Sequence, residues 1–420
     1  MAPVIEDTRQ QPTQAQLHLL RSHLPYSLTV LRRLQVAAGA FDSVSPGKVA
    51  GAGTSPYAHI LFAYDSDGAE GDESASRPFA AAYLDLSKAP ETAAFVYASD
   101  QDTTDEDTSK YNAPLYPVDP PLTDEWPVNR GEELVAAWSS ERRARCRRLV
   151  LALLQHIHSI AKQEAAEILP LLAARQPSSS PDVAAKAAEA ADKFLAKLKI
   201  NIHDGILHLL HRPEAIATAS SPSPLERLKP VAVVNWPYDK WLFRFENVPV
   251  LSDLADNELA VTLAPKEGKA AGSSSTLVWD RVHTPEDLAL VTSRTYVPRI
   301  NDTLLSVPSV ALREKESGVL QAWAFLGIDG SLWTLHTEPA YRGVGLAKTL
   351  ASRLFRQYCG VFDAVVGGGD GTDNQGDGWI MADVSSDNRQ SQGVCRRLGA
   401  KRTWATSWVV LDYDSLGSAE

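Results

Sequence analysis

One segment near residue 340 restricts the possible folds of this chain more than any other. An apolar, strand-like run at 331–337 (SLWTLHT) is ended by Pro339, which cannot donate a hydrogen bond to a β-ladder. The sequence RGVG at 342–345 follows, and an amphipathic helical pattern starts directly after it. Glycines let the backbone approach a ligand closely, and the first N–H groups of a helix point at an anion, which the helix dipole also favours. The segment therefore predicts an α/β domain with a phosphate-binding loop between a strand and a helix.

The segments around this loop carry strand and helix patterns of their own. Thr284 and Pro285 have the residue types of a helix N-cap and a first helical position, and the helix that they begin runs to 295. A hairpin turn is predicted at Asp329-Gly330. Strands are predicted at 277–282, 308–313, 319–327, 331–337, 379–384 and 403–412. Together these elements predict one mixed α/β domain that contains the loop.

The first half of the chain shows similar patterns. Helical periodicity at 14–36 is interrupted by Pro25, and apolar residues at helical spacing predict one long helix over 131–169, either straight or kinked. Strands are predicted at 58–64, 79–86 and 93–98. The remaining segments are predicted as linkers at 176–181 and 217–224, a helix at 182–198, and acidic loops at 65–76, 99–130 and 367–378.

Two clusters in this half allow a functional and a structural interpretation. The arginines between 142 and 148 could bind phosphate, or they could form ion pairs along a helix with acidic neighbours at 132, 133 and 141. The histidines at 203, 208 and 211 have a spacing that metal sites use, but no carboxylate or thiolate partners accompany them. For both clusters we favour the structural interpretation.

The composition and charge of the chain limit the classes of function that it can have. A chain of 420 residues suggests two or three domains at roughly 100–200 residues per domain. Its 41 Lys and Arg against 52 Asp and Glu give a net charge of −11, which argues against a nucleic-acid or anionic-membrane binder. The three cysteines form no CxxC pair, so neither a disulfide framework nor a zinc site is expected, and we predict no metal. No apolar run reaches about 18–20 residues and the N-terminus is polar, so we expect a soluble, cytoplasmic protein.

The loop also carries a resemblance to a known family. The residues from Arg342 to Ala347 fit R-x-x-G-x-A and resemble motif A of the GNAT superfamily of acyl-CoA-dependent N-acyltransferases, in which this loop binds the CoA pyrophosphate. The segment 388–400 (NRQSQGVCRRLGA) is similar to a second conserved segment of the family. The pair Ala322-Trp323 and the run 24–35 (LPYSLTVLRRLQ) resemble the glycine N-acyltransferase-like branch, whose N-terminal half looks like a degraded second copy of the fold.

This resemblance implies the fold class and the domains. We expect an α/β (mixed α+β) fold with two GNAT-like domains, each a central mixed, mostly antiparallel sheet flanked by helices. The expected boundaries are 14–212 for a degenerate N-terminal GNAT-like domain, 213–276 for a linker and joining strand region, and 277–414 for the C-terminal acyltransferase domain. The N-terminal half has no R-x-x-G-x-G/A loop, so we expect it not to bind CoA.

The resemblance also implies a donor site. The donor is acetyl-CoA or another acyl-CoA, and the strand before the loop gives backbone N–H groups to the thioester. The residues that correspond to the family's donor site are Leu335, His336, Thr337, Arg342, Gly343, Val344, Gly345, Leu346, Ala347, Asn388 and Ser391.

Acyl transfer to an amine also needs a base and benefits from an acid. His336 and Glu338 have the same parity at the end of their strand and should share a face, so either could take the amine proton. Asp383 on the strand 379–384 and a water-mediated transfer are further alternatives. The family's usual acid is a Tyr whose position corresponds to Cys395. That thiol, with an ordinary pKa near 8.5, could protonate the leaving thiolate, or it could be a small buried residue.

The expected function is therefore acyl-CoA-dependent N-acyl transfer, first of all N-acetyl transfer, to a small-molecule amine by direct attack in a ternary complex. The alternative is a catalytically weak acyl-CoA-binding sensor or scaffold protein. Neither nucleic acid nor membrane is an expected partner, and the chain is expected to be a monomer or a homodimer. An aminoacyl-tRNA-dependent transferase fits less well because such proteins tend to lack a good pyrophosphate loop.

Overall fold

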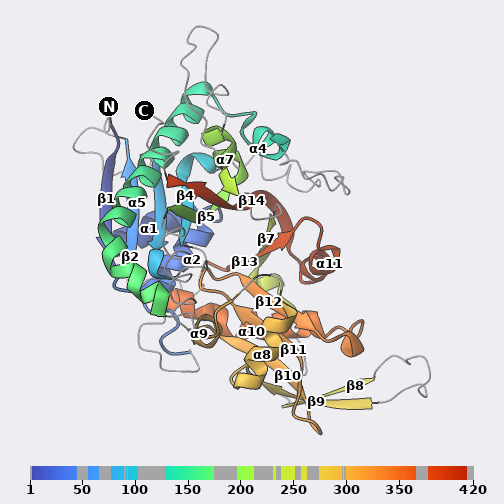
Figure 1. Ribbon diagram of the computed structural model, residues 1–420. Coiled ribbons are helices and arrows are strands. Elements are labelled where there is room, and N and C mark those ends of the chain that lie inside the picture. The colour runs from blue at the N-terminus through green and yellow to red at the C-terminus, as the bar shows by residue number, and fades with distance from the viewer. Residues whose placement is uncertain are drawn as a thin grey trace. The chain divides into compact units, whose positions relative to one another are not determined.

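The chain forms two compact units in the computed structural model (Figure 1). Unit 1 comprises Met1–Ala37, Thr54–Lys240 and Arg402–Glu420, and unit 2 comprises Ala38–Gly53 and Trp241–Lys401. The structure describes residues 2–44, 55–65, 77–88, 91, 93–102, 128–174, 196–211, 230–232, 238–250, 257–262, 274–295, 297, 299–365 and 377–413. The predicted linkers at 176–181 and 217–224, and most of the predicted helix at 182–198 and of the acidic loops at 65–76, 99–130 and 367–378, lie outside these residues.

Unit 1 contains a mixed sheet flanked by helices. Its elements are β1 (Val4–Arg9), α1 (Gln14–Ser22), α2 (Leu28–Ala37), β2 (Ala58–Tyr64), β3 (Phe79–Asp85), β4 (Ala94–Ala98), α4 (Val128–Val135), α5 (Ser140–Ala174), β5 (Lys197–His203), α7 (Asp204–His211), β6 (Pro230–Ala232) and β14 (Lys401–Asp412). The strands follow the order β1-β2-β3-β4-β5-β14, and β6 also pairs with β14. Only the β4–β5 pairing among these described strands is parallel.

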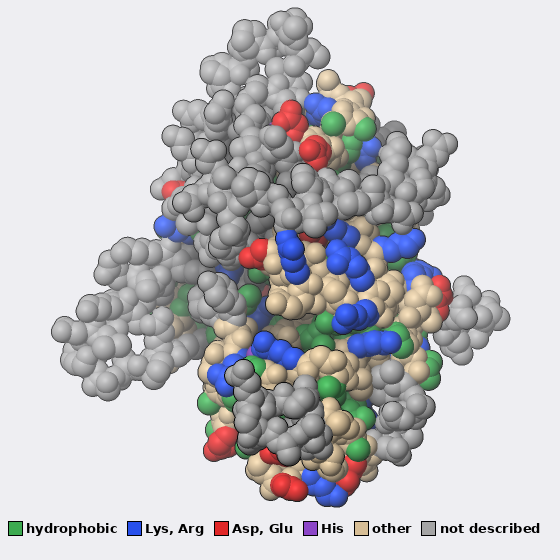
Figure 2. Space-filling view, turned by 90° about the vertical axis from the view of Figure 1, so that its right-hand side faces the viewer, with side chains coloured by type: hydrophobic (Ala, Val, Ile, Leu, Met, Phe, Trp, Pro, Cys, Tyr) green, Lys and Arg blue, Asp and Glu red, His purple; other side chains and the backbone are tan. Residues whose placement is uncertain are grey.

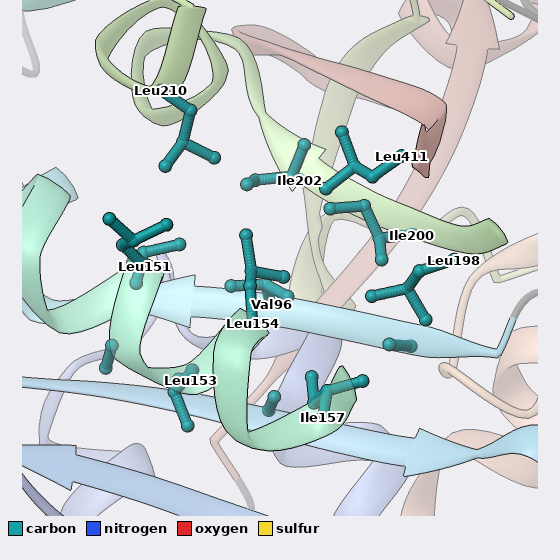
Figure 3. Packing of buried hydrophobic residues seen from close by; sticks show 14 of the residues in the cluster. Val96, Leu151, Leu153, Leu154, Ile157, Leu198, Ile200, Ile202, Leu210 and Leu411 are labelled. Carbon is teal, nitrogen blue, oxygen red and sulfur yellow. The ribbon is translucent and has the colours of Figure 1, made fainter. Parts of the chain in front are cut away.

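The core of unit 1 follows from the alternation of its strands. Every second residue of β3, β4 and β5 belongs to an apolar cluster with α5, for example Ala82, Val96 and Ile200 against Leu154 and Ile157 (Figure 3). Successive side chains of a strand point to opposite faces, so the residues between them project to the other side of the sheet. That side is covered by α2, which contacts β3 and β4.

The helices of unit 1 agree with the sequence-based prediction at Pro25 and differ from it between Val135 and Ser140. The interruption predicted at Pro25 is confirmed, since α1 and α2 lie on either side of a cis Leu24–Pro25 bond. The single helix predicted over 131–169 is wrong, because α4 ends at Val135 and α5 begins at Ser140. The Oγ of Ser139 accepts a hydrogen bond from the Arg142 N–H at 3.2 Å, which starts the second helix in the manner of an N-cap.

The arginines of α5 form ion pairs and backbone contacts. Arg145 pairs with the Asp100 carboxylate at 2.5 Å, Arg148 pairs with Asp65, and Arg142 donates to the backbone carbonyl of Asp100 at 2.8 Å. The partners are therefore acidic residues that follow β2 and β4, rather than the glutamates near 132 and 141. The engagement of these three guanidinium groups favours the structural interpretation over phosphate binding for Arg142, Arg145 and Arg148. Arg147 differs, since it is buried and its Nε and Nη2 have no hydrogen-bond partner among the described residues.

Unit 2 holds a second sheet and the predicted loop. Its elements are β8 (Glu258–Thr262), β9 (Ser274–Asp280), α8 (Pro285–Arg294), α9 (Asn301–Ser306), β10 (Ser309–Glu314), β11 (Leu320–Leu326), β12 (Leu332–Thr337), α10 (Leu346–Tyr358), β13 (Trp379–Ser385) and α11 (Arg389–Arg397). A five-stranded antiparallel sheet has the order β12-β11-β10-β9-β8. The strand β13 pairs with β7 (Tyr238–Arg244), which belongs to unit 2 from Trp241 onward.

The two units repeat one order of elements. The series β1, α1, α2, β2, β3, β4, α5, β5, α7 corresponds to β9, α8, α9, β10, β11, β12, α10, β13, α11, with α4 as an addition in unit 1. A later strand of each series pairs outside its own series: β7, which follows β6 after the first series, pairs with β13, and β14, which follows the second series, pairs with β5. The expected fold class, α/β with mostly antiparallel sheets flanked by helices, is confirmed. The boundaries at 14–212, 213–276 and 277–414 stay a prediction.

Two features of the described residues concern membrane insertion and metal binding. None of the helices there has both the length and the apolar character that crossing a bilayer requires. No group of His, Cys, Asp and Glu within the described part is arranged to hold a metal ion. His203 instead accepts a hydrogen bond from the Gly205 N–H at 3.1 Å, in the turn between β5 and α7.

Candidate active site

The loop between β12 and α10 has a backbone that depends on glycine. A short 3-10 turn, Pro339–Tyr341, leads into it, and Gly343 and Gly345 have φ angles of 83° and 91°. A Cβ atom added at either glycine would meet no heavy atom within 4 Å. The left-handed backbone is costly for other L-residues, and the open space in front of it leaves room for a ligand to approach the main chain.

The N-terminus of α10 opens at the same place. Gly345 is the N-cap residue and supplies no side-chain hydrogen bond, and the first hydrogen bond of the helix joins the Thr349 N–H to the Gly345 carbonyl at 3.2 Å. The N–H groups of the first turn, from Leu346 to Lys348, are therefore available to an anion, which the helix dipole also favours. The loop and the helix together therefore have the backbone geometry that a phosphate cradle requires, while phosphate binding itself stays a prediction.

Two side chains hold this loop to the sheet. Nε of Arg342 donates to the Thr337 carbonyl at 2.9 Å, while the side chain stays exposed. Tyr341 is buried, and its hydroxyl donates to Glu314 Oε1 at 2.9 Å and lies 3.2 Å from Ser275 Oγ. The Tyr341–Glu314 contact was not predictable from the sequence, because Glu314 lies on β10 and meets the loop only in three dimensions.

The strand before the loop diverges from its neighbour. Among the described residues, one isolated parallel bridge joins the two segments, from Ser331, just before β12, to Met381 of β13. The other edge of β12 carries a β-bulge, in which Thr334 has a φ of 48°. A bulge interrupts the ladder and re-aims the backbone groups beside it. The end of β12 therefore has main-chain groups that β13 does not cover.

The bulge also determines which side chains meet. The hairpin register pairs Phe325 with Trp333, and without a bulge it would place Trp323 opposite Leu335. The extra residue places His336 there instead, and its ring stacks on Trp323 with centroids 4.6 Å apart and an interplanar angle of 20°. Leu335 itself lies half-buried on β12.

His336 and Glu338 lie close together, as their parity predicts. His336 Nε2 is 3.6 Å from Glu338 Oε1, and Arg294, at the end of α8, donates from Nε to the same oxygen at 2.8 Å. Burial lowers the pKa of His336 and outweighs the opposing effect of the Glu338 charge. His336 is therefore neutral at pH 7 and able to accept a proton. The contact of Arg294 with Glu338 was not predictable from the sequence, because α8 and β12 are far apart in the chain.

Cys395 lies in an apolar environment. It is 2% exposed and belongs to a cluster with Ala351, Phe355 and Leu398. Burial raises the pKa of its thiol to about 12. This setting favours the alternative of a small buried residue over that of a general acid.

The remaining candidates lie on β13 and α11. Asp383 is half-buried on β13, with Ala382 and Val384 pointing to the opposite face into the apolar cluster. Asn388 is the N-cap of α11, and its Oδ1 accepts a hydrogen bond from the Ser391 N–H at 3.0 Å. Asn388 and Ser391 therefore stabilise the start of α11 in this structure.

These features define a class of protein. A repeated mixed α/β fold with a strand, a glycine loop and an uncapped helix N-terminus agrees with the resemblance to acyl-CoA N-acyltransferases that the sequence carries. Residues 2–241 match the family of the acyl-CoA N-acyltransferase verG N-terminal domain. Since the match spans more than half of the chain, the protein belongs to this family of acyltransferases. No curated protein matches it significantly in sequence.

The solved structures that align with this chain share little sequence identity with it. A Drosophila protein shares 12% identity over 98% of this chain and 99% of its own, with a TM-score of 0.45. A tandem GNAT protein from the clavulanic acid biosynthesis pathway shares 12% over 97% and 98%, with a TM-score of 0.33. A GCN5-related N-acetyltransferase from Kribbella flavida shares 14% over 55% and 72%, with a TM-score of 0.26.

Proposed function

We propose that unit 2 carries the donor site and transfers an acetyl group from acetyl-CoA to a small-molecule amine. The observation that carries this proposal is the loop itself, with two left-handed glycines that face open space before the uncapped α10. A pyrophosphate fits this loop, because it needs backbone N–H donors and close approach to the main chain. The residues that would hold it are Arg342, Gly343, Val344, Gly345, Leu346 and Ala347.

Charge supports the same assignment. Residues 341–402 contain nine Lys and Arg, six Asp and no Glu, in a chain with a net charge of −11. Figure 2 shows Lys and Arg side chains, with Asp and Glu side chains among them, on one face of the molecule. The negative charge of the chain is therefore unevenly distributed, and the segment that contains the loop is suited to an anionic donor.

The divergence of β12 from β13 also supports a binding position at the end of β12 for the thioester and the pantetheine arm of the donor. The thioester of the donor supplies an activated acyl group. The pantetheine arm of the donor needs main-chain groups for hydrogen bonding that are not already paired in a sheet. Backbone groups of Leu335, His336 and Thr337, beside the bulge, meet this need. Thr337 also joins this strand to the loop through its hydrogen bond from Arg342.

We assign proton removal from the acceptor amine to His336. Burial lowers the pKa of its imidazole and so favours the neutral ring, which accepts the proton that the amine nitrogen loses as it bonds to the acyl carbon. Glu338 is held by Arg294 and stabilises the imidazolium that forms. Cys395 takes no part in this scheme, and the CoA thiolate leaves without it. Asp383 and a water-mediated transfer are the alternatives for the base.

The burial of Cys395 also supports the second candidate function, an acyl-CoA-binding sensor or scaffold with weak catalysis. Loss of a general acid typically costs roughly 10²–10⁴-fold in rate. The two candidates differ in turnover and share the donor loop.

Thermal unfolding with and without acetyl-CoA tests the donor site. Donor at 100 times its Kd adds roughly 2.7 kcal/mol, which raises Tm by about 2–4 °C or somewhat less in a chain of this size. Gly345→Glu should abolish the shift. Gly318→Glu is the matched control, because Gly318 also has a positive φ, 71°, and open space around its Cβ position, but lies in the β10–β11 turn.

The outcomes separate the candidates. A shift that Gly318→Glu keeps and Gly345→Glu loses supports the donor loop, and an equal shift in all three proteins contradicts it. A folded wild type that shows no shift with any acyl-CoA refutes both candidate functions. Release of free CoA thiol in a screen of small amines then distinguishes a transferase from a sensor.

A further inference from the structure

The first strand of unit 1, β1, contributes little apolar surface to the core. It pairs antiparallel with β2 at one end of the strand order, and none of its six residues is buried. Ile5 is half-buried and packs against the apolar cluster that includes α5. From the opposite face of the strand, Glu6 Oε1 and Thr8 Oγ1 accept hydrogen bonds from the Gln16 amide of α1, both at 2.9 Å. The attachment of β1 therefore depends on its backbone pairing and on its polar contacts.

His59 of β2 lies between two carboxylates that belong to two other elements. Its side chain is 0% exposed, Nδ1 is 2.9 Å from Asp7 Oδ2 of β1, and Nε2 is 3.1 Å from Glu164 Oε1 of α5. An ionised carboxylate only accepts hydrogen bonds, so both ring nitrogens must donate. The neutral imidazole has one N–H, and the imidazolium has two. This geometry therefore requires the protonated form of His59, which joins β1, β2 and α5 at one point.

The charges around this ring balance only when it is protonated. Arg9 of β1 is paired with His59 in the strand register, and its Nη2 lies 3.1 Å from Glu164 Oε1. Two carboxylates, Asp7 and Glu164, are then matched by two cations. Loss of the ring proton leaves one negative charge in excess and turns a nitrogen lone pair toward a carboxylate. The charge of His59 is therefore needed for the contact between β1 and α5.

Two further residues border the ring from neighbouring elements. Leu84 of β3 is paired with His59 and carries no charge. His156 of α5 lies with Nε2 3.7 Å from Asp7 Oδ2, and its side chain is 36% exposed. A second histidine thus faces the same carboxylate as His59, but it stays in contact with water. Substitution of one histidine at a time can separate their effects.

The neighbouring carboxylates determine the protonation of His59. Burial by itself would lower the pKa of His59, but the hydrogen bonds and the charges of Asp7 and Glu164 outweigh burial and raise the pKa above the ordinary 6.5. The pKa of Asp7 is lowered in spite of burial, because Asp7 interacts with the charged ring. Since the pKa of His59 is raised in the folded state, the stabilisation is fully present below pH 6.5. It is lost as the pH rises through the folded pKa.

We propose that His59 is a pH-sensitive clasp that holds β1 on the sheet. As an imidazolium it bridges Asp7 of β1 and Glu164 of α5. When the ring passes its proton to water, one of these two hydrogen bonds is lost and β1 detaches, which uncovers the backbone edge of β2. The strands β3, β4 and β5 keep their apolar packing against α5, so the release is local. The clasp does not involve the donor loop of unit 2.

Hydrogen–deuterium exchange of the full chain between about pH 5.5 and about pH 9 tests the clasp. Each rate is divided by the intrinsic exchange rate at the same pH, which gives the protection of the backbone amides. Protection of residues 4–9 should fall by up to about tenfold per pH unit above pH 6.5 and level off above the folded pKa of His59. Protection of α10 in unit 2 is the internal reference and should not show this fall.

Three variants assign the effect to His59. His59→Gln removes the imidazolium, so the protection of residues 4–9 should be low at every pH and lose its pH dependence. His156→Gln is the matched control, because it changes the second histidine at the same carboxylate, and it should keep the fall. Glu164→Gln keeps the size of the side chain and removes a charge that raises the pKa of His59, so it should move the fall to lower pH. This variant decides the question if His59→Gln does not fold.

Any of five results would overturn the clasp. In the wild type these are a protection of residues 4–9 that does not change with pH, or an equal fall in α10. In the variants they are the same fall in His59→Gln, the loss of the fall in His156→Gln, or a fall at an unchanged pH in Glu164→Gln.

Discussion

The replacement Asp287→Asn tests how the start of α8 is held in unit 2. The Asp287 carboxylate is 4% exposed and accepts hydrogen bonds from Arg313, from Nη1 at 2.8 Å and from Nη2 at 2.6 Å. It also accepts from the backbone N–H groups of His283 and Thr284, both at 3.1 Å. Burial alone would raise the pKa of this carboxyl, but these hydrogen bonds outweigh burial and lower the pKa from 3.8 to about 2.

The pKa difference sets the size and the pH dependence of the effect. A carboxyl with a pKa near 2 when folded and near 3.8 when unfolded contributes about 2.5 kcal/mol to stability at neutral pH. Because the folded pKa is lowered, this contribution is fully present above the unfolded pKa and is lost as the pH falls through the folded one. About half of it should remain at pH 3 and little at pH 2. Asp287→Asn also leaves Arg313 without this partner, so the expected loss at pH 7 is about 2–4 kcal/mol.

Urea unfolding followed by Trp fluorescence measures this loss at pH 7, 5 and 3. The difference between the wild type and Asp287→Asn should shrink by about 1 kcal/mol between pH 7 and pH 3. Asp302→Asn is the control, since Asp302 is an exposed acidic residue in the first turn of α9, and it should change stability by about 0.5 kcal/mol or less. A difference between wild type and Asp287→Asn that stays constant over this pH range would refute the reasoning.

Two further predictions concern β12 and its surroundings. Gly327→Ala should destabilise the protein by about 1–3 kcal/mol in urea unfolding, because the new Cβ would lie 2.2–2.5 Å from atoms of the Trp333 ring. Gly360→Ala is the control, since its new Cβ would meet no heavy atom within 4 Å, and it should not destabilise the protein. Equal effects of the two substitutions would contradict this packing. In the pH profile of kcat/KM, activity should fall as the pH drops through a His336 pKa below 6.5, and Glu338→Gln should move this limb to lower pH because the Glu338 charge raises that pKa. A limb that persists in His336→Ala would assign the base to another group.

Local chemistry made many elements of this fold predictable. The strand predicted at 58–64 coincides with β2, because β-rich apolar residues there are bounded by polar turns. The helix predicted after Thr284 is confirmed, since the Thr284 hydroxyl accepts from the Asp287 N–H at 3.1 Å and Pro285 occupies the first position. The glycine loop at 342–345 was predictable for the same reason, because its φ angles depend on the residues themselves.

Contacts between distant segments were not predictable from one sequence. The stacking of His336 on Trp323 depends on a bulge that shifts the register by one residue, and no residue type in the hairpin specifies it. Arg33 has the sequence context of any amphipathic helix, so its burial against Tyr83 is visible only when β3 is placed beside α2. The position of β14 beside β5 likewise depends on a long-range pairing that periodicity cannot reveal.

The placement of β14 has a consequence for how the protein is made. Thr406 of β14 bonds to Ile202 of β5 although the two are 204 positions apart, so the ribosome finishes unit 2 before it delivers this strand of unit 1. Until then β5 has an open edge, and open strand edges pair readily with other chains. The nascent chain is therefore most prone to aggregation at the stage when β5 has been synthesised and β14 has not. A nonsense mutation that removes only the last strand would damage the part of the protein that was synthesised first.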